Sequence, residues 1–249
     1  TLRYLTDAGA HVTACSHLGR PEGSSDPAYT MDPVRARLVD LAPGVDLLEN
    51  LRFNPGETGN DPAFVQCLIE GQDAYVNDAF GASHRPHASV VGPPQHLPSA
   101  AGRLLAREVE VLGGLRLSAR RPFVGIMGGA KVSDKIGVIE ALLDVVDELI
   151  VGGGMCFTFL AAKGFPVGDS LCEPDYIDTC RMLMEGNVPI HLPEDIVGLD
   201  ADGVFATFGV RLPNGAKGLD IGPGSAAAFT DIIMDARTVF WNGPMGMFE

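Results

Sequence analysis

Short apolar runs alternate with amphipathic segments along almost the whole chain, and this alternation restricts the fold more than any other feature of the sequence. Buried strands are predicted at HVTAC, VDLLEN, AYVND, FVGIM, ELIVGG and TVFWNG. Helices are predicted at DPVRARLVDL, DPAFVQCLIE, VSDKIGVIEALLDVVDE and EPDYIDTCRMLMEG, with Ser133 capping the third. Because strands that alternate with helices build parallel sheets, the sequence predicts an α/β protein with parallel sheets.

One long segment interrupts the alternation. The stretch LPSAAGRLLAREVEVLGGLRLSARRP predicts a single long helix that ends at Gly113 and Gly114, followed by a basic loop closed by Pro122. We therefore expect two domains, residues 1–97 and residues 119–249, joined by a connector helix within residues 98–118.

Composition and charge exclude several classes of protein. A formal net charge of −14 at pH 7 argues against a general nucleic-acid binder and against docking on anionic membranes, since both need a basic surface. Five cysteines, none of them in C-x-x-C spacing, predict the reduced thiols of a cytoplasmic protein and neither a disulfide framework nor a zinc site. No metal-ligand set is predicted. An acidic protein that binds anions must gather its few positive charges locally, so the positions of Arg and Lys become informative.

In the N-terminal half, each of three predicted strands leads to an arginine. These are Arg20 in SHLGRP, Arg52 in LRF and Arg85 in GASHRPH. Ligands of open parallel sheets bind at the carboxyl ends of the strands, and a guanidinium group matches carboxylate and phosphate. A single such arginine is more simply a solvated loop residue, but three at equivalent positions predict a site for a small, multiply charged anion.

The histidines of these loops fit two roles. His17 lies in the first arginine loop, and His84 and His87 lie in the third. Ligand contact and hydrogen bonding to the loop backbone suit His84 and His87 equally well. His11 and His96 are predicted to be structural.

In the C-terminal half, glycines follow the predicted strands where arginines follow them in the N-terminal half. The stretch GIMGGAKVSDKI places Lys131 and Lys135 beside one glycine turn, and three more turns lie in ELIVGGG, KGLDIGPG and FWNGPMG. Neither G-x-x-x-x-G-K-[ST] nor G-x-G-x-x-G is present. Glycine turns at strand ends suit an extended phosphate ligand such as a nucleotide. A small-anion half and a nucleotide half together predict a phosphotransferase, which needs positioning and charge neutralisation more than covalent chemistry.

The same segments resemble the phosphoglycerate kinase family. SHLGRP, LLENLRF, YVNDAFGASHRPHAS, RPFVGIMGGAKVSDKI, GGGMCFTFL, GLDIGP and FWNGPMGMFE are similar to that family's signature segments, in the family's order. The resemblance implies two Rossmann-like parallel-sheet domains. It implies reversible transfer of a phosphoryl group between 1,3-bisphosphoglycerate with Mg-ADP and 3-phosphoglycerate with ATP, by a cytoplasmic monomer.

The resemblance also implies roles for individual residues. It assigns the phosphoglycerate to His17, Leu18, Gly19, Arg20, Arg52 and Arg85. It assigns the migrating phosphoryl group to Lys131, with Arg20 as a second catalytic residue. It assigns the nucleotide to Lys135, Gly152, Gly153, Gly218 and Glu249.

Three departures from the family pattern leave the activity of this chain open. The family has an Asp-x-Asn segment that is absent before Thr1 and a G-G-D-[ST] segment that is absent after Glu249. It also has about one further strand and helix where this chain has APGVD. We therefore expect the natural protein to extend past both ends. The alternative to the kinase is a catalytically inactive nucleotide- or anion-binding fragment of the family, and an α/β oxidoreductase is disfavoured because G-x-G-x-x-G is missing.

Overall fold

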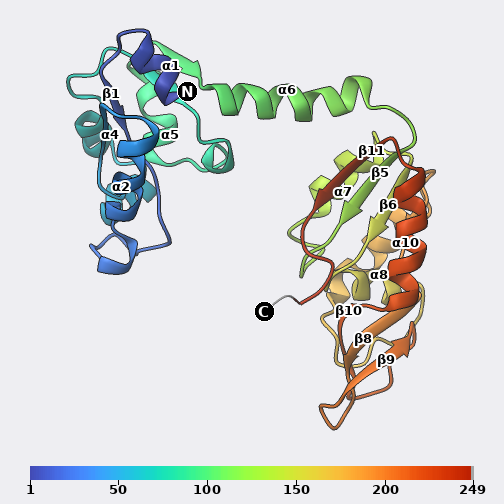
Figure 1. Ribbon diagram of the computed structural model, residues 1–249. Helices are drawn as coiled ribbons and strands as arrows, with labels where there is room; N and C mark the ends of the chain where they lie inside the picture. The colour runs from blue at the N-terminus through green and yellow to red at the C-terminus, as the bar shows by residue number, and fades with distance from the viewer. Residues whose placement is uncertain (248–249) are drawn as a thin grey trace. The chain divides into compact units, whose positions relative to one another are not determined.

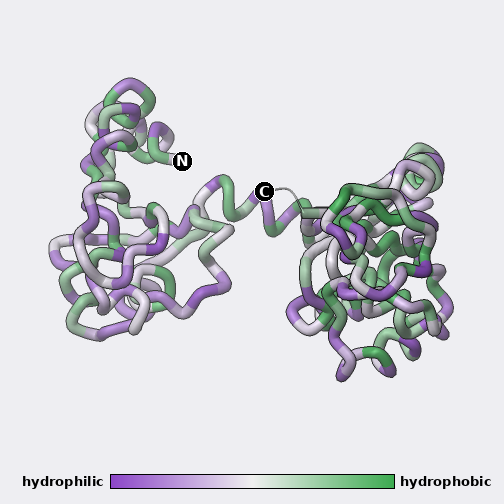
Figure 2. Tube along the Cα trace, turned by 90° about the horizontal axis from the view of Figure 1, so that it is seen from below, coloured by the Kyte–Doolittle hydropathy of each residue, from purple (hydrophilic) through white to green (hydrophobic). Residues whose placement is uncertain are grey.

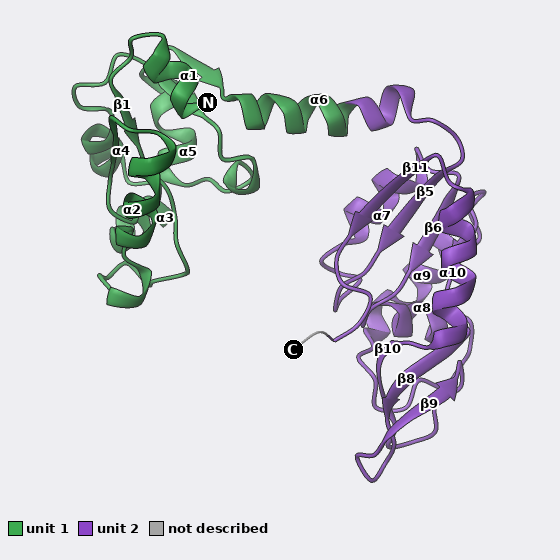
Figure 3. Cartoon of the chain, in the orientation of Figure 1, with its two compact units in different colours: residues 1–113 green, residues 114–249 purple. Residues whose placement is uncertain are grey.

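The computed structural model describes residues 1–247 and forms two compact units, here called unit 1 (residues 1–113) and unit 2 (residues 114–249) (Figure 3). The division lies inside helix α6 (Arg103–Ser118). Each unit is described by itself. Within residues 1–247, no helix combines the length and the apolar character needed to cross a membrane.

Unit 1 contains two parallel pairs of short strands, β1 with β2 and β3 with β4. The predicted strands and helices of this half are confirmed at β1, β2, β3, α2 and α4. Local signals explain the helix starts: Asp61 accepts the N–H of Ala63 at the start of α4, and Pro62 occupies the first helical position. The elements are α1 (Leu2–Asp7), β1 (Val12–Ala14), η1 (Pro27–Tyr29), α2 (Asp32–Leu41), β2 (Val45–Leu47), η2 (Leu51–Phe53), α3 (Pro55–Thr58), α4 (Pro62–Ile69), β3 (Tyr75–Asn77), η3 (Phe80–Ala82), α5 (Ala88–Val91), η4 (Pro93–Gln95) and β4 (Ser99–Ala101).

The long helix α6 differs from its prediction at both ends. Residues 99–101, expected to be helical, form β4 alongside β3, and the N–H of Tyr75 bonds to the carbonyl of Pro98 where the pair begins. The helix also continues through Gly113 and Gly114 to Ser118. Leu115 packs against the hydrophobic core of unit 2, which stabilises the helical turn beyond the two glycines.

Unit 2 is built on a four-stranded parallel sheet in the order β11-β5-β6-β7. Figure 1 labels the first three of these strands. Strand β5 is buried along its whole length, and its side chains alternate between two cores. Phe123 and Met127 pack with residues of α7 and α8, while Val124 and Ile126 pack with Phe229 of α10. The sheet is therefore the middle layer of three, and Figure 2 shows the hydrophobic trace running through the middle of this unit.

The order of these strands reverses next to β5. The chain steps from β5 to β6 to β7 in one direction, whereas β11 joins on the other side of β5. This reversal is a topological switch point, the place where open α/β sheets bind ligands at the carboxyl ends of their strands. The elements of this sheet and its helices are β5 (Phe123–Met127), α7 (Ile136–Leu143), β6 (Glu148–Val151), α8 (Cys156–Ala162), η5 (Pro174–Tyr176), α9 (Ile177–Met184), β7 (Ile190–His191), α10 (Pro223–Asp235) and β11 (Thr238–Asn242).

A second sheet in unit 2 is antiparallel. Strand β8 (Asp195–Leu199) pairs with both β9 (Phe205–Gly209) and β10 (Lys217–Ile221). The expectation that the glycines of KGLDIGPG follow a strand of the parallel sheet is therefore wrong. Strand β10 still approaches that sheet, because the N–H of Met247 bonds to the carbonyl of Leu219.

Candidate functional site

The structure brings the three predicted arginines of unit 1 together. An Nη atom of Arg52 donates to the carbonyl of Gly19 at 2.5 Å, which ties the second arginine loop to the first. Burial lowers the pKa of Arg52, and the positive charges of Arg85 and Arg20 lower it further. The positive charges of Arg20 and Arg85 thus act on Arg52, and such a cluster has the charge and geometry to attract a multiply charged anion.

Asn50, which the sequence did not identify as functional, holds the first arginine loop in place. Its buried amide donates to the carbonyls of Leu18 and Tyr29 at 2.7 and 2.9 Å, and its Oδ1 accepts the N–H groups of Leu18 and Arg52. An asparagine just before a helical turn is a common turn residue, so only its burial reveals this role.

Gly19 allows the same loop to turn. Its φ is +60°, and a Cβ at this position would lie 2.3 Å from ring atoms of Tyr29. The close contact with an aromatic ring explains why the turn in SHLGRP is a glycine.

The histidines of unit 1 differ in burial: His87 is buried, His17 is half-buried, and His11, His84 and His96 are exposed. The Nε2 of His17 lies 2.6 Å from an Oε atom of the buried Glu57, and His87 is buried beside them. His11 forms an exposed pair with Asp46 at 3.3 Å. Within residues 1–247, His17, Glu57 and His87 are the one group of metal-ligand side chains close enough to hold an ion.

In unit 2, the loops after three parallel strands pack against one another at the switch point. The N–H of Gly128 bonds to the carbonyl of Asn242 at 2.8 Å, and that of Gly129 bonds to Pro244 at 2.9 Å. Gly153 follows β6 and its N–H bonds to the carbonyl of Met245 at 2.7 Å. The glycines thus allow the three loops to pack backbone against backbone. The surface that these packed loops form, here called the floor, lies at the switch point, where the fold favours ligand binding.

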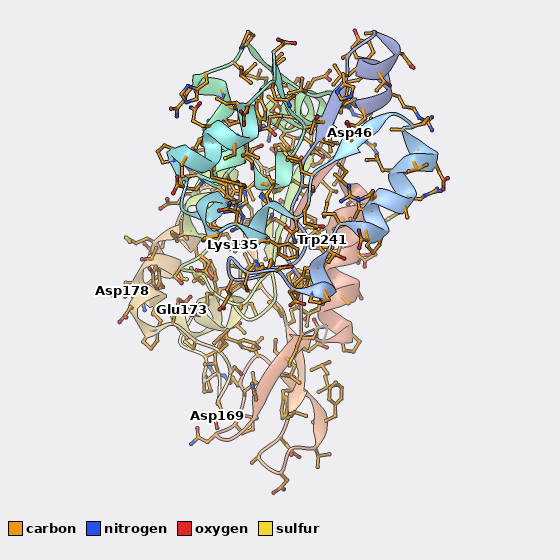
Figure 4. The ribbon with its side chains drawn as sticks, turned by 90° about the vertical axis from the view of Figure 1, so that its left-hand side faces the viewer. Asp46, Lys135, Asp169, Glu173, Asp178 and Trp241 are labelled. Carbon is orange, nitrogen blue, oxygen red and sulfur yellow. The ribbon has the colours of Figure 1, made fainter. Side chains whose placement is uncertain are left out.

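The two lysines beside this floor have different surroundings. The Nζ of Lys135 donates to Oδ1 of Asn242 at 2.6 Å, which places the ammonium group at the carboxyl end of β11. Lys131 is exposed. Figure 4 labels Lys135 at the start of α7, Trp241 on β11 and Glu173 before η5.

Ser133 does not cap α7, so that prediction is wrong. The helix begins later, at Ile136, with Lys135 before it. The Oγ and N–H of Ser133 instead bond to the carboxylate of Glu173 at 2.6 and 3.1 Å. Burial alone would raise the pKa of Glu173, but these bonds and the charge of Lys131 hold it below its ordinary value. Glu173 thereby fixes the loop that carries both lysines.

The remaining predicted nucleotide residues lie in three places. Gly152 and Gly153 are buried after β6. Gly218 is buried on β10, where its N–H bonds to Oγ of Ser170 and its missing side chain leaves room for Phe157. Glu249 lies outside the described residues.

Comparison with known proteins identifies relatives of the whole chain. A family model described as phosphoglycerate kinase matches residues 40–249. The chain is 51% identical over 277 aligned positions to phosphoglycerate kinase of Rubrobacter xylanophilus, covering 100% of this chain and 71% of the relative. It is also 51% identical over 282 positions to phosphoglycerate kinase of Salinispora tropica, with the same coverage. Both alignments are longer than the chain, so the relatives carry residues inside the aligned region that have no counterpart here.

Solved structures show the same relationship. The structure of phosphoglycerate kinase from Coxiella burnetii matches with a TM-score of 0.80 and 34% identity, over 99% of this chain and 71% of that one. That of phosphoglycerate kinase from Pyrococcus horikoshii matches with a TM-score of 0.80 and 28% identity, over 98% of this chain and 71% of that one. The chain therefore belongs to the phosphoglycerate kinase family, whose members are glycolytic phosphotransferases.

Proposed function

We propose that the protein transfers a phosphoryl group reversibly between 1,3-bisphosphoglycerate with ADP and 3-phosphoglycerate with ATP. The observation that carries this proposal is that one chain holds both an arginine cluster, in unit 1, and a glycine-lined switch point, in unit 2. Family membership favours this reaction over an inactive binding module and over an oxidoreductase.

The phosphoglycerate side of the reaction is assigned to unit 1. Arg20, Arg52 and Arg85 bind the phosphate and carboxylate of the substrate, since their convergence supplies three positive charges. His17, Leu18 and Gly19 belong to the loop that Asn50 and Arg52 hold in place.

The nucleotide side is assigned to unit 2. Lys135 binds nucleotide phosphates at the switch point, and Gly152, Gly153 and Gly218 border the nucleotide. Glu249 is assigned to the ribose from the resemblance alone. Mg²⁺ enters as part of the nucleotide substrate, on its phosphate oxygens.

The chemistry needs no general base from the protein. In the direction that consumes ATP, the nucleophile is the carboxylate of 3-phosphoglycerate, which is ionised near pH 7. Negative charge on the transferring group is the main barrier, and the exposed ammonium of Lys131 and the guanidinium of Arg20 are assigned to neutralise it.

The proposal also covers the domain boundaries, the cellular location and the oligomeric state of the protein. We assign residues 1–97 to the phosphoglycerate domain, residues 98–118 to the connector and residues 119–249 to the nucleotide domain. Free thiols at all five cysteines suit a cytoplasmic protein, and a monomer is expected in sedimentation experiments.

Arginine variants test the division between the two sites. Arg52→Ala and Arg85→Ala should each weaken phosphoglycerate binding by about 1.5–3 kcal/mol, the value of a charge-assisted hydrogen bond, and leave ATP binding nearly unchanged. Calorimetric titration with each ligand measures both effects. Arg37→Ala is the control, because that arginine forms an exposed pair with Asp40. Equal losses for both ligands would refute the two-site assignment.

A further inference from the structure

Glu57 is the fully buried carboxylate of the described residues: its exposed fraction is 0%. It lies in α3, in the stretch NPGET, where an acid in a short helix would ordinarily be solvated. A buried carboxylate is costly unless it is paired and hydrogen-bonded, so its partners indicate what it does.

Glu57 joins helix α5, which follows the third arginine loop, to the first arginine loop. One carboxylate oxygen lies 2.6 Å from Nε2 of His17 and 2.6 Å from Oγ of Ser89, and the other accepts the N–H of Ser89 at 3.0 Å. Burial alone would raise the pKa of Glu57, but the hydrogen bonds from His17 and Ser89 outweigh it and lower the pKa. Glu57 is therefore ionised at neutral pH.

An ionised carboxylate only accepts hydrogen bonds, so the proton of the 2.6 Å contact belongs to Nε2 of His17. This bond fixes the ring orientation and leaves the lone pair of Nδ1 free to accept a hydrogen bond, such as one from the hydroxyl group of 3-phosphoglycerate. His87 supports the same ring edge-on, with ring centroids 5.2 Å apart and an interplanar angle of 83°.

Glu57 also acts on the arginines. Its charge raises the pKa of Arg52, against the lowering by burial, Arg85 and Arg20. Convergent guanidinium groups repel one another before substrate arrives, and a buried negative charge beside them reduces that repulsion.

Binding of a metal ion is the alternative role for His17, Glu57 and His87. His87 has an Nδ1 without a hydrogen-bond partner among residues 1–247, 3.6 Å from Glu57. Burial lowers the pKa of His87, and the charges of Arg52 and Arg85 lower it further although Glu57 opposes them, so the imidazole is in the neutral form that a metal ion needs. Two other features argue against a cation. The same arginines would repel a divalent cation, and Glu57 already accepts three hydrogen bonds.

We propose that Glu57 is a positioning residue for phosphoglycerate binding: it holds His17 with the proton on Nε2 and offsets the repulsion among Arg20, Arg52 and Arg85. The inference rests on the proposed role of those four residues. It assigns no contact between Glu57 and substrate.

The test is Glu57→Gln, which keeps the size of the side chain and removes its charge. Steady-state kinetics should show KM for 3-phosphoglycerate raised roughly tenfold, with KM for ATP within twofold of the wild type. In long-range ¹H–¹⁵N spectra, His17 should carry its proton on Nε2 in the wild type and lose that preference in the variant, because a glutamine amide also donates.

Tyr75→Phe is the matched control for stability. The Tyr75 hydroxyl donates to the carbonyl of Ser89 at 2.7 Å, beside the cluster but away from the Glu57–His17 contact. This variant should lower the unfolding midpoint and leave both KM values within twofold. Glu57→Gln with a lowered midpoint, unchanged KM for 3-phosphoglycerate and an unchanged His17 spectrum would overturn the inference.

Two further results separate the inference from its premise. If His17→Ala and Arg52→Ala both leave KM for 3-phosphoglycerate unchanged, the proposed site is wrong and the inference falls with it. If those variants raise KM and Glu57→Gln does not, the site stands and the role of Glu57 alone is refuted. Micromolar Zn²⁺ binding by the wild type, lost in Glu57→Gln, would also overturn the inference in favour of a metal site.

Discussion

Lys135 and Asn242 link the start of helix α7 to the end of strand β11 through a hydrogen bond of 2.6 Å from Nζ to Oδ1. Lys135 follows β5 and Asn242 is the last residue of β11, and these two strands flank the switch point of the sheet. The bond therefore holds the ammonium group at the place where the fold favours a phosphate ligand.

Asn242→Ala should weaken nucleotide binding although it removes no charge. Without its acceptor, Lys135 gains rotamer freedom that must be lost again on binding, so we expect a loss of about 0.5–1.5 kcal/mol in ATP affinity. Calorimetric titration with ATP measures it. Lys163→Ala removes an exposed lysine after α8 and should leave ATP affinity unchanged. Wild-type affinity in Asn242→Ala would show that the bond does not position Lys135 for binding.

Lys131→Ala should affect turnover more than binding. Lys131 is exposed on the loop that Glu173 fixes through Ser133, so its ammonium is available to a phosphoryl group in transit. Loss of one such positive charge should lower kcat by roughly 10²–10³-fold with a smaller change in KM for ATP. A coupled dehydrogenase assay measures both constants. Normal turnover with impaired ATP binding would exchange the roles of Lys131 and Lys135.

The sequence predicted the parallel α/β fold because each strand and helix of that pattern carries its own local signal. All six predicted strands are present, and the fully apolar FVGIM is the buried β5 between two helical layers. Arg20 and Arg52 were found because the paired parallel strands β1 and β2 deliver their ends to one edge. Arg85 follows β3, which belongs to a separate pair, so the expectation of a single sheet edge was wrong although the charge of Arg85 still acts on Arg52.

The errors arose where distant contacts outweigh local signals. Ser133 carries a capping side chain, but Glu173, 40 residues away, takes both of its donors. Glu57 and Asn50 were missed because an acid or an amide near a turn has the same local pattern whether it is buried or solvated. The antiparallel β8–β10 sheet was missed because it breaks the alternation on which the prediction rested.

Stability at acid pH should depend on Asp195. Its carboxylate accepts the N–H groups of Gly224 and Ser225 at 2.9 and 2.7 Å at the start of α10. Burial would raise the pKa of Asp195, but its hydrogen bonds with Ser225 and Gly224 outweigh burial and lower it. A depressed pKa in the folded state stabilises the protein above the unfolded pKa of about 3.9 and loses that contribution as pH falls through the folded value.

Asp195→Asn should therefore lower the unfolding midpoint at pH 7, by the equivalent of about 1–2 kcal/mol, and the deficit should shrink as pH falls below about 4. Thermal unfolding followed by circular dichroism between pH 7 and pH 3 measures this difference. Glu194→Gln changes an exposed neighbour and should follow the wild-type profile. A deficit that stays constant across this range would show that the charge of Asp195 does not contribute.

Two glycine substitutions should have opposite effects on stability. Gly153 has a φ of +65°, and a Cβ there would lie 2.7 Å from backbone atoms of Gly129 and Pro244. Gly153→Ala should cost more than about 2 kcal/mol, because the left-handed conformation and the displaced loops both oppose the methyl group. Gly114 lies inside α6 with nothing within 4 Å of a Cβ, so Gly114→Ala should stabilise by about 0.5–1 kcal/mol.

The same pair of variants separates packing from ligand binding. Because Gly153 supports the loops after β5 and β11, Gly153→Ala should also weaken ATP binding, whereas Gly114→Ala should leave it unchanged. Urea unfolding and ATP titration of both variants measure the two effects. If Gly153→Ala were as stable as the wild type and bound ATP normally, the close packing of the three loops would not form the floor of the nucleotide site. The protein would then have to bind nucleotide away from the switch point, and the assignment of Lys135 would fall as well.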